Sequence, residues 1–291
     1  MPRTTVETAE SMLDQEIKVL DKGFVRLVDY MGGDQRIVQA ARVSYGAGTK
    51  SYRQDRGLIN YLIKHWHTSP FEQVQLTFHT KMPIFVARQW VRHRTAKLNE
   101  ISGRYSVMKD EFYVPEPQHV CVQSESNKQG RSDAVPHDQA MEVIAQMEKE
   151  QREVYGNYQN LLDQGIAREL ARSNLPLSLY TEWYWSIDLH NLFHFLRLRL
   201  DPHAQYEIRV YAEAMAECAR AVAPLAYEAF EEHILGSVTF SRAESEALTA
   251  LLAGRAHELT GRALAQFEEK IAKLQAATAA EAADEPEPVT P

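Results

Sequence analysis

The alternation of apolar and polar residues predicts a small number of strands. Val74, Leu76 and Phe78 alternate with polar neighbours, and this period of two is typical of a half-buried strand. The apolar runs IKVL and FVRLVDY flank Asp21-Lys22-Gly23, which predicts a hairpin. The aromatic-rich segment LYTEWYWSI predicts one more strand.

Helical spacing of apolar residues dominates the rest of the chain and predicts an α+β fold. Pro83 suits the first turn of a helix that continues through IFVARQWVRHR. Residues 115–137 are rich in Pro, Gln, Ser and Asn, which favours a long surface loop. The other predicted helices lie near 34–44 and 54–66, from Asp138 to about Leu162 with Gly165 just beyond, in IARELARSN, in HNLFHFLRLRL and over 204–230.

The two ends of the chain differ in composition from its middle. Residues 1–16 predict a flexible lead, and the Ala, Pro and acid-rich residues 276–291 predict a disordered acidic tail. Ser241 and Glu244 have the spacing of a capping box, and the helical pattern after them runs to about Gln275. We therefore expect one large domain over 17–235 and a C-terminal helical extension over 236–275.

The net charge of −8 disfavours a protein whose whole surface binds nucleic acid, and half of that charge lies in the tail. Cys121 and Cys218 form no CxxC or Cys/His pattern, so neither a disulfide framework nor a structural zinc site is expected. No apolar run approaches the roughly 18 residues of a membrane span, and the N-terminus has no apolar signal core. The expectation is a soluble cytoplasmic protein.

Residues 88–106 concentrate positive charge in an acidic chain, and such an excess favours an anionic ligand. On a helix Arg88 and Arg92 share a face, and Asn99, Glu100 and Ser102 follow in an expected loop. The alternative is a solvated basic helix end, and this structural role is favoured for an isolated arginine such as Arg172. The cations of the cluster are Arg88, Arg92, Arg94, Lys97 and Arg104, with His93 among them.

A second polar cluster lies in HNLFHFLRLRLDPHAQ. His190 and His194 share a helix face, but Asn191 stands where the strongest zinc motifs place glutamate. Hydrogen bonding to a heterocyclic ligand or to a neighbouring subunit is therefore favoured over a metal, and buried histidines satisfied by the backbone are the alternative. His67, close to Ser69-Pro70 in a turn, is a further candidate for ligand contact.

The sequence offers no activated nucleophile. Cys218 lies in an Ala-rich amphipathic helix, Cys121 has no neighbouring base, and Ser102 lacks the G-x-S-x-G context. There is also no Walker A loop and no G-x-G-x-x-G after a strand. A phosphate-bearing ligand would therefore be held mainly by side-chain cations.

The segment RHRTAKLNEIS, from Arg92 to Ser102, resembles the RHR-x7-S signature of flavin-dependent thymidylate synthases. The segments ARVSYGAG, HTSPFEQ, PIFVARQW and LRLDPHAQYEIR reinforce the resemblance, which covers about residues 17–235. It implies a homotetramer with a central mixed or antiparallel sheet flanked by helices and with active sites between subunits. The implied reaction converts dUMP, 5,10-methylenetetrahydrofolate and NADPH to dTMP, tetrahydrofolate and NADP through FAD, without an enzyme cysteine.

The resemblance also implies roles for individual residues. Arg199 is the catalytic residue beside the pyrimidine, where its cation would stabilise negative charge on the ring after loss of the N3 proton. His67 lies near the flavin and the folate, and Ser102 positions dUMP. The implied FAD contacts are Ser44, Ser69, Arg92, His93, Arg94, Thr95, Glu100, Asp188, His190 and His194. The implied dUMP contacts are Gln89, Arg92, Glu100, Ser102, Gly103, Arg104, Arg172 and Arg199.

One departure affects the flavin site. Some family members carry Asn, Arg and Asn where this chain has Asp188, His190 and His194. A carboxylate is unfavourable near a pyrophosphate, so we expect Asp188 to face a ribose hydroxyl or the helix N-terminus. Two other functions remain open: a nucleotide or nucleic-acid binding module that uses residues 88–106, and a metal-dependent hydrolase built on the histidine pair, although no metal is expected.

Overall fold

The computed structural model describes residues 5–43, 52–125 and 129–283. The chain divides into two compact units, Met1–Leu235 and Gly236–Pro291, and each is considered by itself. Among the described residues, no helix combines the length and apolar character that a bilayer span requires.

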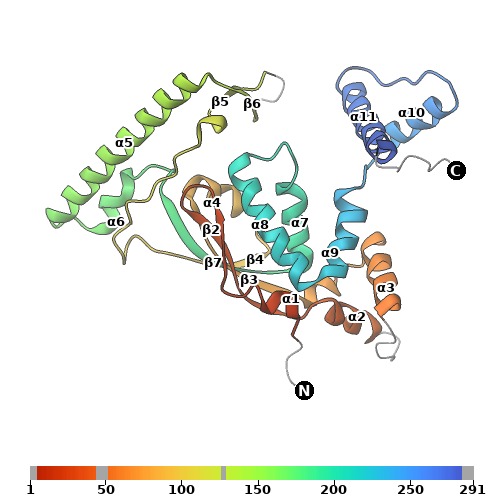
Figure 1. Cartoon of the computed structure of the whole chain (residues 1–291), viewed down its shortest axis with the longest axis horizontal. Coiled ribbons are helices and arrows are strands. Elements are labelled where there is room, and N and C mark those ends of the chain that lie inside the picture. Colours follow the sequence, from red (N-terminus) through yellow and green to blue (C-terminus); the bar gives the residue numbers. More distant parts are fainter. Residues whose placement is uncertain (1–4, 44–51, 126–128, 284–291) are drawn as a thin grey trace, which may run out of the picture. The chain divides into compact units, whose positions relative to one another are not determined.

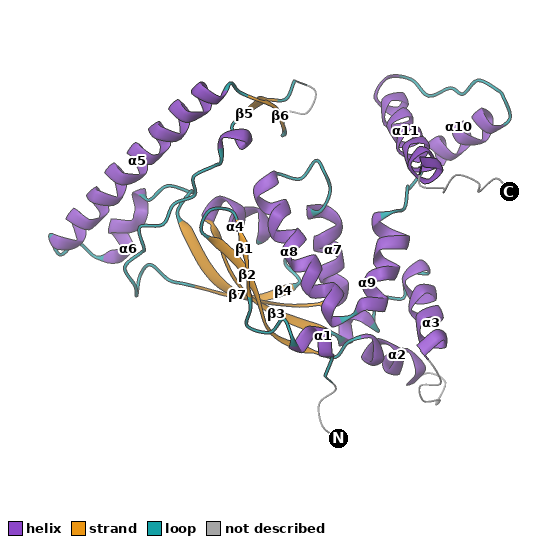
Figure 2. Ribbon diagram, in the orientation of Figure 1, coloured by secondary structure: helices purple, strands orange, loops and turns teal. Residues whose placement is uncertain are grey.

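A five-stranded antiparallel sheet forms the centre of the first unit (Figure 2). The predicted hairpin and the two other predicted strands are confirmed, and the sheet is antiparallel rather than mixed. In spatial order the strands are β1 (Glu16–Val19), β2 (Gly23–Met31), β3 (Gln75–Pro83), β7 (Tyr180–Asp188) and β4 (Ala96–Glu100).

Helices cover one face of this sheet, and the period-two pattern decides which side chains they bury. Phe78, Trp183 and Trp185 point to the covered face and are almost fully buried, whereas Tyr184 on the opposite face is 47% exposed. Trp90 is the centre of the packing, with ring centroids 5.4 Å from Trp183 and 5.1 Å from Phe195. The helices that carry this layer are α4 (Ile84–Trp90), α7 (Leu189–Arg199) and α8 (Tyr206–Val222).

Further helices complete the unit, as Figure 1 shows. Most helices predicted from apolar spacing are confirmed, and Gly165 follows the longest one with a φ of +76°, a left-handed conformation that glycine adopts without strain. These helices are α1 (Glu7–Glu10), α2 (Asp34–Arg42), α3 (Tyr52–Lys64), α5 (His137–Asp163), α6 (Arg168–Ala171) and α9 (Pro224–Phe230), with single turns η2 (Phe71–Gln73), η3 (Pro117–His119), η4 (Arg172–Asn174) and η5 (Glu231–Leu235).

Two predicted irregular segments contain regular structure. The lead is not loose throughout, because α1 buries Ala9 completely against the core. The predicted surface loop 115–137 contains η3 and the hairpin of β5 (Cys121–Gln123) and β6 (Arg131–Ala134). In both places tertiary contacts stabilise structure that composition alone disfavours.

Two predicted helices are shorter than expected. The helix after Pro83 ends at Trp90, because the chain must turn to pair β4 with β7. The helix predicted over 204–230 is divided at Pro224, which has no N–H for the helical ladder. The carboxylate of Asp34 accepts hydrogen bonds from the backbone N–H groups of Leu225 and Ala226, at 2.8 and 3.0 Å, and so satisfies the start of α9.

The second unit contains α10 (Arg242–Leu252) and α11 (Gly261–Ala283). The predicted capping box is present, with Ser241 and Glu244 bonded reciprocally. The continuous helical pattern predicted to Gln275 is interrupted after α10, where Gly254 has a φ of +67°, and resumes at Gly261, whose φ is +56°. Residues 276–283 of the predicted disordered tail instead continue α11, and residues 284–291 lie outside the described residues.

Candidate active site

The basic motif, Arg92-His93-Arg94, follows the end of α4, and packing in the core determines where this helix ends. Trp90 is fully buried, so the next residues leave the core in a tight turn that leads into β4. The helix ends before Arg92, so the predicted helix face shared by Arg88 and Arg92 is wrong. Arg92 and Arg94 are exposed, and neither side chain makes an ion pair or hydrogen bond with any residue in the described ranges. Two unpaired cations suit an anionic ligand.

Arg199, at the end of α7, contacts the motif through His93. The Arg199 Nε–H donates a hydrogen bond to Nε2 of His93 at 3.1 Å. Burial, together with the charges of Arg199 and His194, lowers the pKa of His93 to about 4, so the imidazole is neutral at pH 7. Since Nε2 accepts, the ring hydrogen lies on Nδ1. The contact fixes Arg199 by its Nε and leaves both terminal nitrogens of the guanidinium for a ligand.

The low pKa of His93 predicts a specific pH dependence of stability. Between pH 6.5 and about pH 4 the unfolded chain protonates this histidine and the folded chain does not, so acidification destabilises the fold. The free energy of unfolding should therefore fall more for the parent protein than for His93→Gln when the pH is lowered from 7 to 5. Urea denaturation at both pH values measures the difference, and equal losses would contradict it.

The start of α7 is built around Asp188. Its carboxylate accepts the Asn191 backbone N–H at 2.9 Å and the Asn191 side-chain amide at 2.7 Å, so the predicted position at the helix N-terminus is confirmed. Thr95 donates from its hydroxyl to Asn191 Oδ1 at 2.8 Å. Asp188 thus holds Asn191, which in turn ties the basic motif to α7. No pattern in the sequence indicated this role of Asn191.

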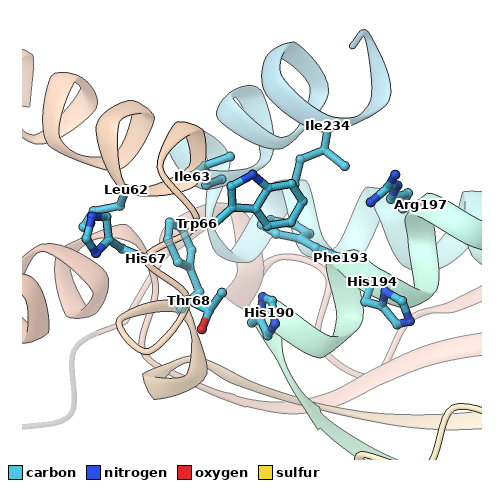
Figure 3. A pocket seen from close by; sticks show the side chains of 11 residues that line it. Leu62, Ile63, Trp66, His67, Thr68, His190, Phe193, His194, Arg197 and Ile234 are labelled. Atoms are coloured by element: carbon cyan, nitrogen blue, oxygen red, sulfur yellow. The ribbon is translucent and has the colours of Figure 1, made fainter. Parts of the chain in front are cut away.

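A cavity of about 60 Å³ lies beside α7 and collects three predicted residues, His67, His190 and His194 (Figure 3). Phe193 and Trp66 give it apolar walls, and Arg197 adds a cation from the same helix. Trp66 is 63% exposed and has a φ of +59°, a left-handed conformation that is uncommon outside glycine. Apolar spacing places Trp66 only at a helix end, so nothing in the sequence identified it as a cavity residue.

A second group of predicted residues lies after β4. A Cβ atom on Gly103 would lie 2.8 Å from Met108 Sδ and 3.0 Å from Arg172 Cδ, so any other residue would require these two side chains to shift. Ser102 Oγ accepts the backbone N–H of Arg104 at 3.3 Å. Arg172, from η4, therefore packs against the Ser102–Arg104 turn. The loop predicted to hold Asn99, Glu100 and Ser102 is wrong in part, because Asn99 and Glu100 belong to β4.

The two groups lie at opposite ends of β4. Arg92, His93 and the contact to Arg199 precede the strand, and Ser102 and the contact to Arg172 follow it. The strand has five residues, which is about 16 Å of extended chain. Within the described part of one chain, no hydrogen bond, ion pair or ring contact joins the two groups.

Three remaining predicted residues occupy different settings. Glu100, at the end of β4, accepts a hydrogen bond from Thr181 at 2.6 Å. Ser69 is exposed in the turn before η2, and Ser44 lies outside the described residues.

Among the described residues, no group of three or more His, Cys, Asp or Glu side chains is arranged to hold a metal ion.

Gln89, on the last turn of α4, donates a hydrogen bond from its side-chain amide to the carbonyl oxygen of Gln205. Gln205 in turn contacts the buried Glu207. Sequence reasoning assigned no role to either partner, because they lie more than a hundred residues away in the chain.

Family models and curated relatives match almost the whole chain. The family described as thymidylate synthase complementing protein matches residues 26–225, which is well over half of the sequence. The chain belongs to the flavin-dependent thymidylate synthase family. Proteins of that name from Treponema denticola and Rickettsia conorii are 63% and 53% identical over 89% and 92% of this chain, and the matches cover 98% and 96% of those relatives.

A solved structure supports the fold of this flavin-dependent thymidylate synthase family member. The UMP/dUMP methylase PolB from Streptomyces cacaoi, bound with 5-Br dUMP, is 34% identical with a TM-score of 0.69. The match covers 75% of this chain and 98% of that one. The family resemblance was expected to stop near residue 235, and this was wrong, because a family described as thymidylate synthase ThyX C-terminal domain matches residues 238–277.

Proposed function

We propose that this chain converts dUMP to dTMP with FAD as cofactor, 5,10-methylenetetrahydrofolate as carbon donor and NADPH as reductant. Membership of the flavin-dependent thymidylate synthase family supports thymidylate synthesis and the flavin. The likeness to PolB, which holds a brominated dUMP, supports a uridine nucleotide as substrate. The contact between Arg199 and a neutral His93, beside the unpaired Arg92 and Arg94, is the observation that carries the proposal.

The hydrogen-bond donors and apolar side chains beside α7 suit a flavin nucleotide. Phe193 and Trp66 offer apolar surface to a ring, and His190 and His194 offer N–H groups at its edge. Arg92 and Arg94 would hold the phosphates. The bound flavin would carry hydride from NADPH. The residues proposed to hold it are Ser44, His67, Ser69, Arg92, His93, Arg94, Thr95, Glu100, Asp188, His190 and His194, with Asp188 acting through Asn191.

Arg199 would stabilise the pyrimidine when the ring carries negative charge. Its Nε is bonded to His93, so the two terminal nitrogens can face the nucleotide as fixed donors. A protonated His93 would repel Arg199, and the low pKa of His93 removes that repulsion at neutral pH. Arg172 and Arg104 would bind the phosphate, and the Ser102 hydroxyl would orient the nucleotide.

The division of the dUMP residues between two ends of β4 supports active sites shared between subunits of a homotetramer. One chain brings Arg199 to one end and Arg172 to the other, so a complete site needs two chains. Large apolar side chains are also exposed around β4, namely Leu98, Ile101 and Tyr184. A second subunit would remove this surface from water.

The reaction would need no enzyme thiol. Burial and the charge of Glu217 raise the pKa of the Cys218 thiol to about 12, so it is not a nucleophile at neutral pH. We expect the double variant Cys121→Ala/Cys218→Ala to keep at least about half of the parent activity and to lose about 1 kcal/mol of stability from the small cavity. Initial rates of dTMP formation measure this. Complete loss in a folded protein would establish a role for a thiol.

The visible absorption spectrum tests the proposed function directly. Purified protein should show a flavin band that changes shape when dUMP is added, because both ligands would occupy one site. NADPH oxidation should also be faster with dUMP than without it. A colourless protein that cannot be reconstituted with FAD would refute the proposal.

A further inference from the structure

The imidazole of His93 has one paired and one unpaired nitrogen. Its Nε2 accepts the Nε–H of Arg199 at 3.1 Å, whereas its Nδ1 makes no hydrogen bond with any residue in the described ranges. The ring is half-buried and packs against Phe195 and His194, with ring centroids 4.9 and 6.0 Å away. Packing therefore holds the ring in place, and one of its two polar atoms is left for a ligand.

The partner of Nε2 decides where the ring carries its hydrogen. A guanidinium has only donors and stays charged, so Nε2 of His93 must be the acceptor. The low pKa of His93 keeps the ring neutral, and its single hydrogen therefore lies on Nδ1. Arg199 thus makes the remaining polar atom of His93 a hydrogen-bond donor. Without such a partner, a neutral imidazole can carry the hydrogen on either nitrogen.

His93 lies next to the cavity beside α7. Its ring contacts that of His194, which lines this cavity (Figure 3). The pyrimidine part of a flavin ring carries two carbonyl oxygens and unprotonated ring nitrogens, all of which accept hydrogen bonds. An Nδ1–H complements such an acceptor, whereas an unprotonated Nδ1 would face it acceptor to acceptor. The tautomer that Arg199 imposes is the one that suits a flavin.

We propose that Arg199 is also a positioning residue for the flavin, because it holds His93 in the tautomer that donates its Nδ1–H to an acceptor atom of the flavin ring. The inference rests on the proposed function, in which FAD lies beside α7 and Arg199 faces dUMP. One guanidinium then serves both ligands. Its Nε fixes the donor for the flavin, and its terminal nitrogens face the nucleotide.

Two amide substitutions separate the two nitrogens of His93. The side-chain amide of glutamine reaches the position of Nε2, and that of asparagine reaches the position of Nδ1. His93→Gln can accept from Arg199 but loses the donor, so we expect FAD to bind about tenfold more weakly and dUMP to bind as in the parent. His93→Asn keeps a donor but frees Arg199, so we expect parent-like FAD binding and dUMP binding about tenfold weaker.

Titration of flavin-free protein with FAD, followed by flavin fluorescence, measures the first affinity. The change of the flavin absorption band on addition of dUMP, at saturating FAD, measures the second. His65→Gln is the matched control, because His65 is exposed just beyond α3, where its ring contacts Tyr61. It should bind both ligands as the parent does. If both His93 variants lose both affinities equally, His93 is purely structural and the inference fails. A parent protein that binds no FAD would instead overturn the proposed function.

Nitrogen NMR of the histidine-labelled protein tests the tautomer without any ligand. At pH 7 the flavin-free parent should show a neutral imidazole with its hydrogen on Nδ1, and this signal should be missing in either His93 variant. In Arg199→Ala the same ring should also populate the form with hydrogen on Nε2. This change leaves the ring in place, so it should weaken flavin binding less than His93→Gln does. A parent ring with its hydrogen on Nε2 would refute the inference even if a His93 variant did not fold.

Discussion

Arg199→Ala should lower the turnover number for dTMP formation by about 10²- to 10³-fold, because it removes a preorganised cation from the pyrimidine. Flavin should stay bound, since Arg199 contacts the motif through His93 and does not hold the apolar walls of the cavity beside α7. Initial rates and the flavin absorption band of the same preparation measure the two effects separately.

Two further variants sharpen this result. Arg199→Lys keeps the charge but loses the planar fork and the Nε–H donated to His93, so its turnover should lie between those of the parent and of Arg199→Ala. Arg220→Ala removes an exposed arginine of α8 that pairs with Glu231 and should turn over like the parent. A rate of Arg199→Ala within about twofold of the parent would remove Arg199 from the mechanism.

Mixing two inactive variants should restore activity. If each site takes Arg172 from one subunit and Arg199 from another, Arg172→Ala and Arg199→Ala chains together can form some sites in which both arginines are intact. Random assembly of equal amounts gives intact sites in about a quarter of cases. The variants should be unfolded together, refolded and assayed for dTMP formation.

The control for this experiment uses two residues from the same end of β4. Arg92 and Arg199 lie on the same side of that strand in one chain, so a mixture of Arg92→Ala and Arg199→Ala should recover nothing. Recovery in that control, or none in the first mixture despite confirmed exchange of subunits, would argue that one chain supplies the whole site.

Local pattern predicted the framework of the sheet well. The alternation at Val74–Phe78 and the hairpin around Asp21-Lys22-Gly23 appear as expected, because burial of one sheet face imposes a period of two. The segments that failed were those where distant pairing outweighs local preference. Residues 96–100 look like a polar loop and become a strand only through Trp183–Ile187.

The candidate site shows the same division between features set by neighbouring residues and features set by distant contacts. The sequence placed Arg92, His93 and Arg94 together and indicated an anionic ligand, because these residues are neighbours in the chain. It assigned no role to Gln205 or Asn191, since each acts through a partner about a hundred residues away. The left-handed backbone conformation of Trp66 also cannot be predicted from the spacing of apolar residues.

By itself the sequence determined the family, the strand pattern and the cationic motif, since these depend on residues close together in the chain. The tertiary structure alone decided which side chains meet. It set a neutral His93 against Arg199, because burial and a neighbouring charge lower the pKa of the imidazole. It also placed the two groups of residues proposed to bind dUMP at opposite ends of β4, because an extended strand holds its ends apart.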